Sequence, residues 1–194
     1  MSEPVNEVAM LEAALEQGLQ LRRAGAGDAA LEMLDLIVSH FETADHPVAH
    51  FAVSRAMLGR AMALVDLDRE PDALEALDGL LARIRGFDDQ EYRELRILAA
   101  YEAAMLLGGQ GDHEGAAEGL AFAIAQALGD EPAKVQHILA AAHVKLAVAR
   151  LNLDDGDGAR RALDQVRTRW GGSDDPSLRH WVDEAAKMRD GMAG

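Results

Sequence analysis

The stretch GLQLRRAGAGDAALEML, from Gly18 to Leu34, contains the unit from which the chain is built. Three of its positions recur at a step of 43 residues: a small residue, an alanine twelve residues later and a leucine four residues after that. The three sets are Gly18, Ala61, Ala104 and Ala147; Ala30, Ala73, Ala116 and Ala159; and Leu34, Leu77, Leu120 and Leu163. A fixed period of this length is typical of repeating units that stack on one another.

Composition favours an all-helical protein. Alanine, leucine, glutamate and arginine abound, and these residues have high helix propensity. The 194 residues are enough for one domain with a sizeable core. Cysteine is absent, which excludes disulfides, thiolate zinc sites and cysteine nucleophiles.

Helix starts follow the same period. Pro4, Pro47 and Pro176 fall on one lattice of 43-residue steps, and proline is well tolerated in the first turn of a helix. Two residues before each lattice position stand residues that we expect to cap the helices, namely Ser2, Asp45, Asp88, Glu131 and Asp174. The pattern predicts helices beginning near residues 3, 46, 89, 132 and 175.

A turn rich in glycine, aspartate or asparagine follows each of the first four helices and predicts a second helix in every repeat. The second helices are expected at about 28–42, 70–85, 113–128 and 157–170. The predicted repeats are about 4–45, 46–88, 89–131 and 132–173, within one domain of residues 1–194. A last helix, about 175–190, carries an apolar stripe (Leu178, Trp181, Val182, Ala185 and Ala186) and is interpreted as a cap of the stack.

The repeat resembles the tetratricopeptide repeat (TPR), in which a small residue is followed by leucine, alanine and leucine at these spacings. The best copy is Gly18, Leu21, Gly27-Asp28, Ala30 and Leu34. The usual TPR period is 34 residues, so a period of 43 implies longer helices. HEAT repeats share the longer period but lack the spacing from small residue to alanine. The resemblance implies a right-handed α-solenoid of four helix-turn-helix units plus the capping helix.

In TPR proteins the first helices of the repeats line a concave groove that binds peptides or partner helices. Transfer of the groove positions gives eight apolar residues: Leu15, Leu19, Leu58, Met62, Tyr101, Met105, Val144 and Val148. Methionine and tyrosine suit an adaptable recognition surface. The alternative is that these side chains belong to the core, since an apolar stripe at helical spacing is shared by both kinds of surface.

Motifs for catalysis or metal binding are incomplete. His113-Glu114 begins like a zinc-protease helix, but Ala117 stands where the second histidine is required. His46 and His50 lie one helical turn apart and are interpreted as surface residues. His143 is interpreted as a hydrogen-bonded core residue, with a place in the groove near Tyr101 and Val144 as the alternative. We therefore expect no enzyme activity, no metal and no cofactor.

The expected function is that of a non-enzymatic scaffold that binds a protein or peptide partner. A net charge of −15 disfavours nucleic acid. No signal peptide and no uninterrupted apolar run of membrane-spanning length is found, so we expect a cytoplasmic protein that does not enter membranes. Two alternatives stay open: a regulatory sensor that binds a small peptide or metabolite, and a self-assembling subunit that forms a homo-oligomer.

Overall fold

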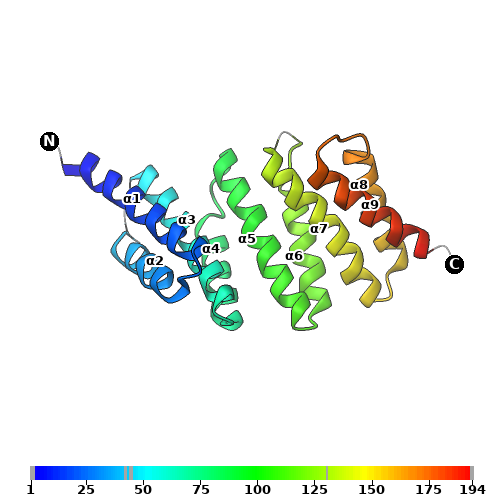
Figure 1. Ribbon diagram of the computed structural model, residues 1–194, viewed down its shortest axis with the longest axis horizontal. Coiled ribbons are helices and arrows are strands. Elements are labelled where there is room, and N and C mark those ends of the chain that lie inside the picture. The colour runs from blue at the N-terminus through cyan, green and yellow to red at the C-terminus, as the bar shows by residue number, and fades with distance from the viewer. Residues whose placement is uncertain (1–2, 42, 44–45, 130, 193–194) are drawn as a thin grey trace. The chain divides into compact units, whose positions relative to one another are not determined.

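The computed structural model describes residues 3–41, 43, 46–129 and 131–192. These residues form nine α-helices and no strand (Figure 1). The helices are α1 (Glu3–Arg23), α2 (Gly27–Phe41), α3 (Pro47–Asp66), α4 (Glu70–Arg83), α5 (Gln90–Gly109), α6 (His113–Ala125), α7 (Ala133–Asn152), α8 (Gly156–Trp170) and α9 (Pro176–Gly191). The predicted starts of the first helices are confirmed to within one residue, and the four second helices are confirmed with ends that differ by at most three residues.

The residues that cap the helices lie one position later than the sequence predicts. At α9, Asp175 rather than Asp174 is the N-cap, and its Oδ1 accepts the backbone N–H of Ser177 at 2.8 Å. At α3 the cap is His46, whose Nδ1 accepts the N–H of Val48 at 3.3 Å. The shift follows from proline, which occupies the first turn in both helices and leaves the residue directly before it as the cap.

The other predicted caps have different outcomes. The N-caps of α5 and α7 are Asp89 and Pro132 rather than Asp88 and Glu131, and neither makes a side-chain cap hydrogen bond. The side chain of Glu131 turns back to the preceding loop instead. Ser2 and Asp45 lie outside the described residues.

The chain divides into two compact units, residues 1–88 and 89–194, and the division falls on the predicted boundary between the second and third repeats. In the first unit α1 packs on α2 and α3, α2 on α3, and α3 on α4. In the second unit α5 packs on α6 and α7, α6 on α7, α7 on α8 and α9, and α8 on α9. Within each unit, each helix thus contacts the next and first helices contact first helices, which is the packing of an α-solenoid. The single domain stays a prediction.

All twelve repeat positions are buried, as the period requires. At the first crossing, a Cβ on Gly18 would lie 3.0 Å from Cδ2 of Leu34. At the third crossing, a Cβ on Gly119 would lie 3.0 Å from Cβ of Ala104. Small residues therefore let the two helices of a hairpin approach closely, and leucine fills the remaining space.

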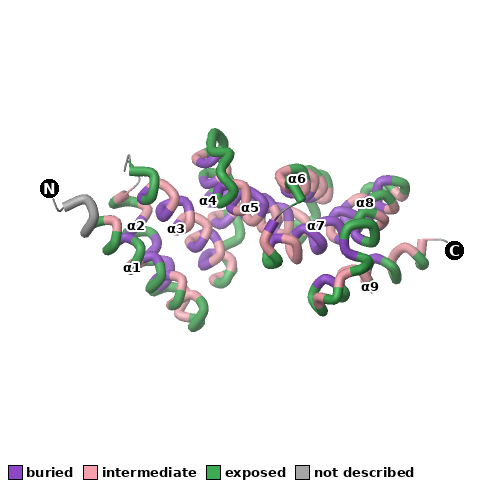
Figure 2. Tube along the Cα trace, turned by 90° about the horizontal axis from the view of Figure 1, so that it is seen from above, coloured by how far each residue is buried: buried purple, intermediate pink, exposed green. Residues whose placement is uncertain are grey.

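Burial follows the helical period in both units (Figure 2). One cluster in the first unit includes Leu11, Leu34 and Ile37, and a larger cluster in the second unit includes Leu139 and Trp170. Neither cluster crosses the division between the units. Each unit is stabilised by a core of its own.

Helix α9 carries one apolar face, as predicted. Leu178 and Ala185 are buried against the core of the second unit, and Trp181 and Val182 are partly buried there. Ala186, which the sequence places on the same stripe, is exposed. The polar outer side of α9 suits the predicted cap.

Helix α3 is long and apolar enough to cross a membrane by length and composition, with a mean hydropathy of 1.2 over 18 residues. Half of that window is buried inside the structure, and the helix packs on α1, α2 and α4. A core helix of a stacked protein has the same properties. The expectation of no membrane contact stays a prediction.

Candidate functional site

The predicted groove residues of the first unit are mostly engaged in packing. Leu15 is 1% exposed and belongs to the core cluster, and Leu19 packs against that cluster. A Cβ on Gly59 would lie 2.7 Å from Cδ2 of Leu19, which shows how closely α1 approaches α3 here. Leu58 and Met62 are half-buried. The burial of Leu15 favours the interpretation that it belongs to the core. Leu19, Leu58 and Met62 remain partly exposed.

In the second unit the four predicted residues differ from one another. Val144 is 3% exposed and lies in the core, whereas Val148, one turn further along α7, is 40% exposed. Tyr101 and Met105 of α5 are half-buried, and Tyr101 packs against the core cluster. Burial, and secondarily the negative charge of Glu102, raises the pKa of the Tyr101 hydroxyl. The phenol is therefore neutral and available as a hydrogen-bond donor.

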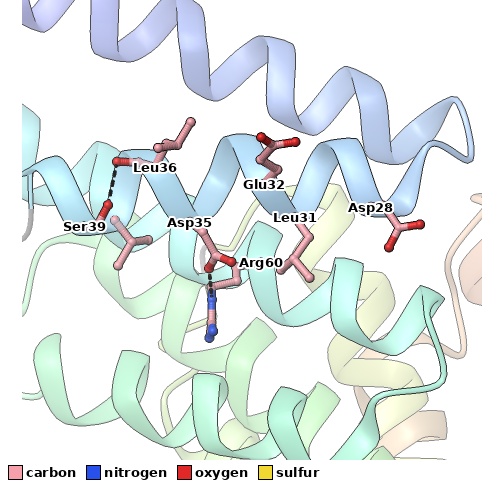
Figure 3. A pocket seen from close by; sticks show the side chains of 8 residues that line it. Asp28, Leu31, Glu32, Asp35, Leu36, Ser39 and Arg60 are labelled. Carbon is pink, nitrogen blue, oxygen red and sulfur yellow. Dashed lines mark hydrogen bonds and ion pairs between the residues drawn. The ribbon is translucent and has the colours of Figure 1, made fainter.

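The sequence reasoning missed a hollow along α2, a second helix, shown in Figure 3. Its volume is about 760 Å³, and it is open to solvent. The lining residues, which we call the α2 groove, are Asp28, Leu31, Glu32, Asp35, Leu36, Val38, Ser39 and Arg60. All except Arg60 belong to α2, and Arg60 comes from α3.

The α2 groove mixes carboxylates with apolar side chains. Asp35 Oδ1 accepts a hydrogen bond from Nε of Arg60, which ties α2 to α3. Ser39 donates its hydroxyl to the carbonyl of Leu36 at 3.2 Å. Leu36 itself is 59% exposed, which is unusual for a leucine in the middle of a helix. Its exposure was not predictable from the repeat, because the period identifies only the positions that must be buried.

A smaller hollow of about 310 Å³ lies where the turn after α1 meets the end of α3. Arg22 Nη1 bonds Asp66 Oδ2 at 3.0 Å across it. A Cβ on Gly27 would lie 2.9 Å from Cδ2 of Leu67, so the two turns are in close contact. These contacts hold the turns of neighbouring hairpins together, and we interpret this hollow as structural.

The histidines singled out by sequence do not gather into a site. His46 uses Nδ1 as a helix cap, and the ring of His50 stacks on Phe87 at 4.5 Å. Burial, and secondarily the charge of Arg83, lowers the pKa of His50. Within the part of the chain that the structure describes, no three histidine, aspartate or glutamate side chains are placed to hold a metal ion.

His143 is a core residue, as the sequence predicts, but the hydrogen bond expected for it is not formed. It is 5% exposed, and its ring meets Trp170 edge-on at 5.9 Å. Neither ring nitrogen has a hydrogen-bond partner. Burial, and secondarily the charge of Arg169, lowers its pKa to about 4, so the imidazole is neutral at physiological pH.

A buried glutamate closes the loop before α7. Glu131 Oε1 accepts the backbone N–H of Leu128 and, at 2.9 Å, that of Gly129. Burial alone raises the pKa of Glu131, but the hydrogen bonds from backbone amides and the charge of Arg169, at 3.9 Å, outweigh burial and lower it. The carboxylate therefore stays charged and shapes the loop.

Structure comparison identifies the fold. A Podosopora anserina protein of nearly identical TPR-like repeats, named as a kinesin light chain, matches 100% of this chain and 92% of its own, with a TM-score of 0.67 and 18% identity. A variant of that protein matches 96% of this chain and 91% of its own, with a TM-score of 0.68 and 19% identity. No protein-family model and no curated protein matches the sequence. The chain therefore has the fold of TPR-like repeat proteins, an α-solenoid built from long helical hairpins.

Proposed function

We propose that this protein is a non-enzymatic interaction module that binds a helical or extended segment of a partner protein on its first helices. Helix-in-groove binding uses apolar anchors at successive helical turns, and the first helices carry such residues at equivalent positions of successive repeats. The TPR-like fold supports this role, because stacked hairpins present extended surfaces for binding.

The observation that carries the proposal is the exposure of Val148 on α7 beside half-buried apolar residues on α5. Val148 and Met105 are equivalent positions in adjacent repeats, and α5 packs on α7. A partner that covers Val148 gains apolar contact without opening the core. Leu151, one turn further along α7, is also exposed and extends the apolar surface toward the end of the helix.

The proposal also states which kind of macromolecule the protein binds and where in the cell it acts. With a net charge of −15, the chain repels phosphate backbones, so a protein is the preferred partner and nucleic acid is not. A location in the cytoplasm is part of the same proposal.

The test compares Val148→Glu with Leu153→Glu in a pull-down from the native host, with bound proteins identified by mass spectrometry. Both residues are exposed leucine or valine side chains of similar accessibility, and both variants add one negative charge. We expect a partner retained by wild type and by Leu153→Glu to be lost by Val148→Glu, with circular dichroism unchanged. Equal retention by both variants would refute binding on the first helices.

A further inference from the structure

The face of α2 that lines the α2 groove carries two acidic residues and a leucine, each one turn apart. Asp28, Glu32 and Leu36 occupy positions i, i+4 and i+8, so they lie along one side of the helix, and all three are exposed. We propose that the α2 groove is a second docking surface and that its occupant is a basic amphipathic helix of a partner protein. This inference rests on the proposed role in protein binding but not on the first-helix residues.

Charge complementarity selects a basic occupant. The α2 groove holds three carboxylates and one guanidinium, and that guanidinium, on Arg60, is already bonded to Asp35. Among the described residues, neither Asp28 nor Glu32 forms an ion pair. Two carboxylates are therefore free to meet arginine or lysine, and an anionic surface such as a phosphate backbone or an acidic membrane would be repelled.

Leu36 supplies the apolar anchor. It is 59% exposed, and Leu31 and Val38 line the same groove. In Figure 3, Leu36 and Glu32 project from α2 on the same side, while Asp35 points toward Arg60. An amphipathic helix lying along α2 would cover Leu36 with its apolar stripe and bring cations four residues apart to Glu32 and Asp28.

The same order of residues recurs on α6 of the second unit. Glu114, Glu118 and Phe122 are the equivalents two repeats later, and all three are exposed. In the second and fourth repeats the apolar position is taken by Gly79 and Gln165. The pattern of two acids followed by an exposed large apolar residue thus appears in one second helix of each unit and is independent of the hollow along α2.

The experiment uses the full chain as bait for a displayed library of 18-residue helical peptides that share a leucine stripe and have random residues beside it. Selected peptides are then measured by fluorescence anisotropy against wild type, Leu36→Ala and Glu32→Lys. We expect arginine and lysine to be enriched. Loss of a leucine contact should weaken binding about tenfold for Leu36→Ala, and Glu32→Lys should weaken it several-fold at low salt, with a smaller effect at high salt.

Glu75→Lys is the matched control. Glu75 stands at the position of α4 that is equivalent to Glu32, is exposed and lies outside the groove, and its substitution changes the net charge equally. A peptide in which the cation facing Glu32 is changed to glutamate should bind Glu32→Lys better than wild type. A general effect of net charge on binding would not explain why exchanging the two charges restores the affinity.

The remaining outcomes separate the two proposals. Enrichment of acidic or neutral peptides, or equal affinity for wild type and Leu36→Ala, overturns the α2 groove. If the selected peptides bind Leu36→Ala as tightly as wild type but no longer bind Val148→Glu, the proposed function stands and only this inference fails. Self-association of the chain that Leu36→Ala abolishes would identify a second copy as the occupant and also overturn the inference. If no peptide is enriched, this inference fails, whereas the proposed function, which includes extended segments, is decided by the pull-down with Val148→Glu.

Discussion

Trp181 of α9 donates its indole N–H to Nε2 of His137 on α7 at 3.0 Å, and the two rings meet edge-on at 5.9 Å. Because the indole nitrogen can only donate, His137 must present an unprotonated Nε2. This hydrogen bond joins the capping helix to the last complete repeat by a specific polar contact in addition to apolar packing. Figure 1 shows α9 beside α7 at the C-terminal end of the second unit.

We expect Trp181→Phe to lower the free energy of unfolding by about 1 kcal/mol, because the substitution keeps most of the ring packing but removes the donor. Hydrogen exchange should increase first in α9. His180→Ala serves as the control, since the ring of His180 is exposed although it contacts Trp181 at 5.0 Å. Unchanged exchange in α9 for Trp181→Phe would contradict a role of this bond in holding the cap.

Acid should destabilise the second unit through His143. Burial lowers the pKa of this imidazole to about 4, whereas the unfolded chain has the ordinary value near 6.5. The unfolded state therefore binds the proton first, so stability is full above about pH 6.5 and falls as the pH drops toward 4. Between pH 7 and pH 5 the loss should be about 2 kcal/mol.

Urea unfolding at pH 7 and pH 5 measures this loss, and His143→Met should remove most of it. Methionine occupies the equivalent position two repeats earlier, at Met57. The pKa of Glu131 is lowered, so its contribution to the free energy of unfolding is also lost in acid. That loss begins only below the ordinary glutamate pKa of about 4.5, outside the window from pH 7 to pH 5. The same pH dependence in wild type and His143→Met would exclude His143 as its source.

The crossing of α1 and α2 should not accept a larger side chain. Ala30 is fully buried, whereas its neighbour Ala29 is exposed on the same helix. We expect Ala30→Leu to cost about 1–3 kcal/mol, because a closely packed crossing must shift to admit the added carbon atoms. Ala29→Leu, with identical chemistry, should change the melting temperature little. Equal melting temperatures for the two variants would place the crossing elsewhere.

Glu131→Ala should loosen the loop between α6 and α7. The substitution leaves the backbone N–H groups of Leu128 and Gly129 without their carboxylate, which we expect to cost about 1–3 kcal/mol. Glu131→Gln keeps one acceptor oxygen and should cost less. Faster hydrogen exchange at these two amides is the direct measurement, and protection equal to that of wild type would show that solvent replaces the carboxylate at no cost.

The sequence alone was sufficient for the repeat, the helices and the buried frame. Leu34 and Ala73 could be assigned to the core because the same residue type recurs at every step of the 43-residue period. A position that recurs in this way packs against the equivalent residue in each hairpin. Pro47 and Pro176 located helix starts because proline lacks the N–H that the helix interior requires. These features depend on local geometry, which the order of residues specifies directly.

The tertiary structure decided which side chains of the candidate sites are exposed. Val144 and Val148 belong to the same stripe of α7, yet one is buried and the other is not. The exposure of Leu36, and the side chain of Glu131 turning back to its loop, were likewise not predictable. The physical reason is that exposure depends on how closely other helices approach, and an apolar residue at helical spacing has the same sequence pattern whether a neighbouring helix covers it or leaves it open to a partner.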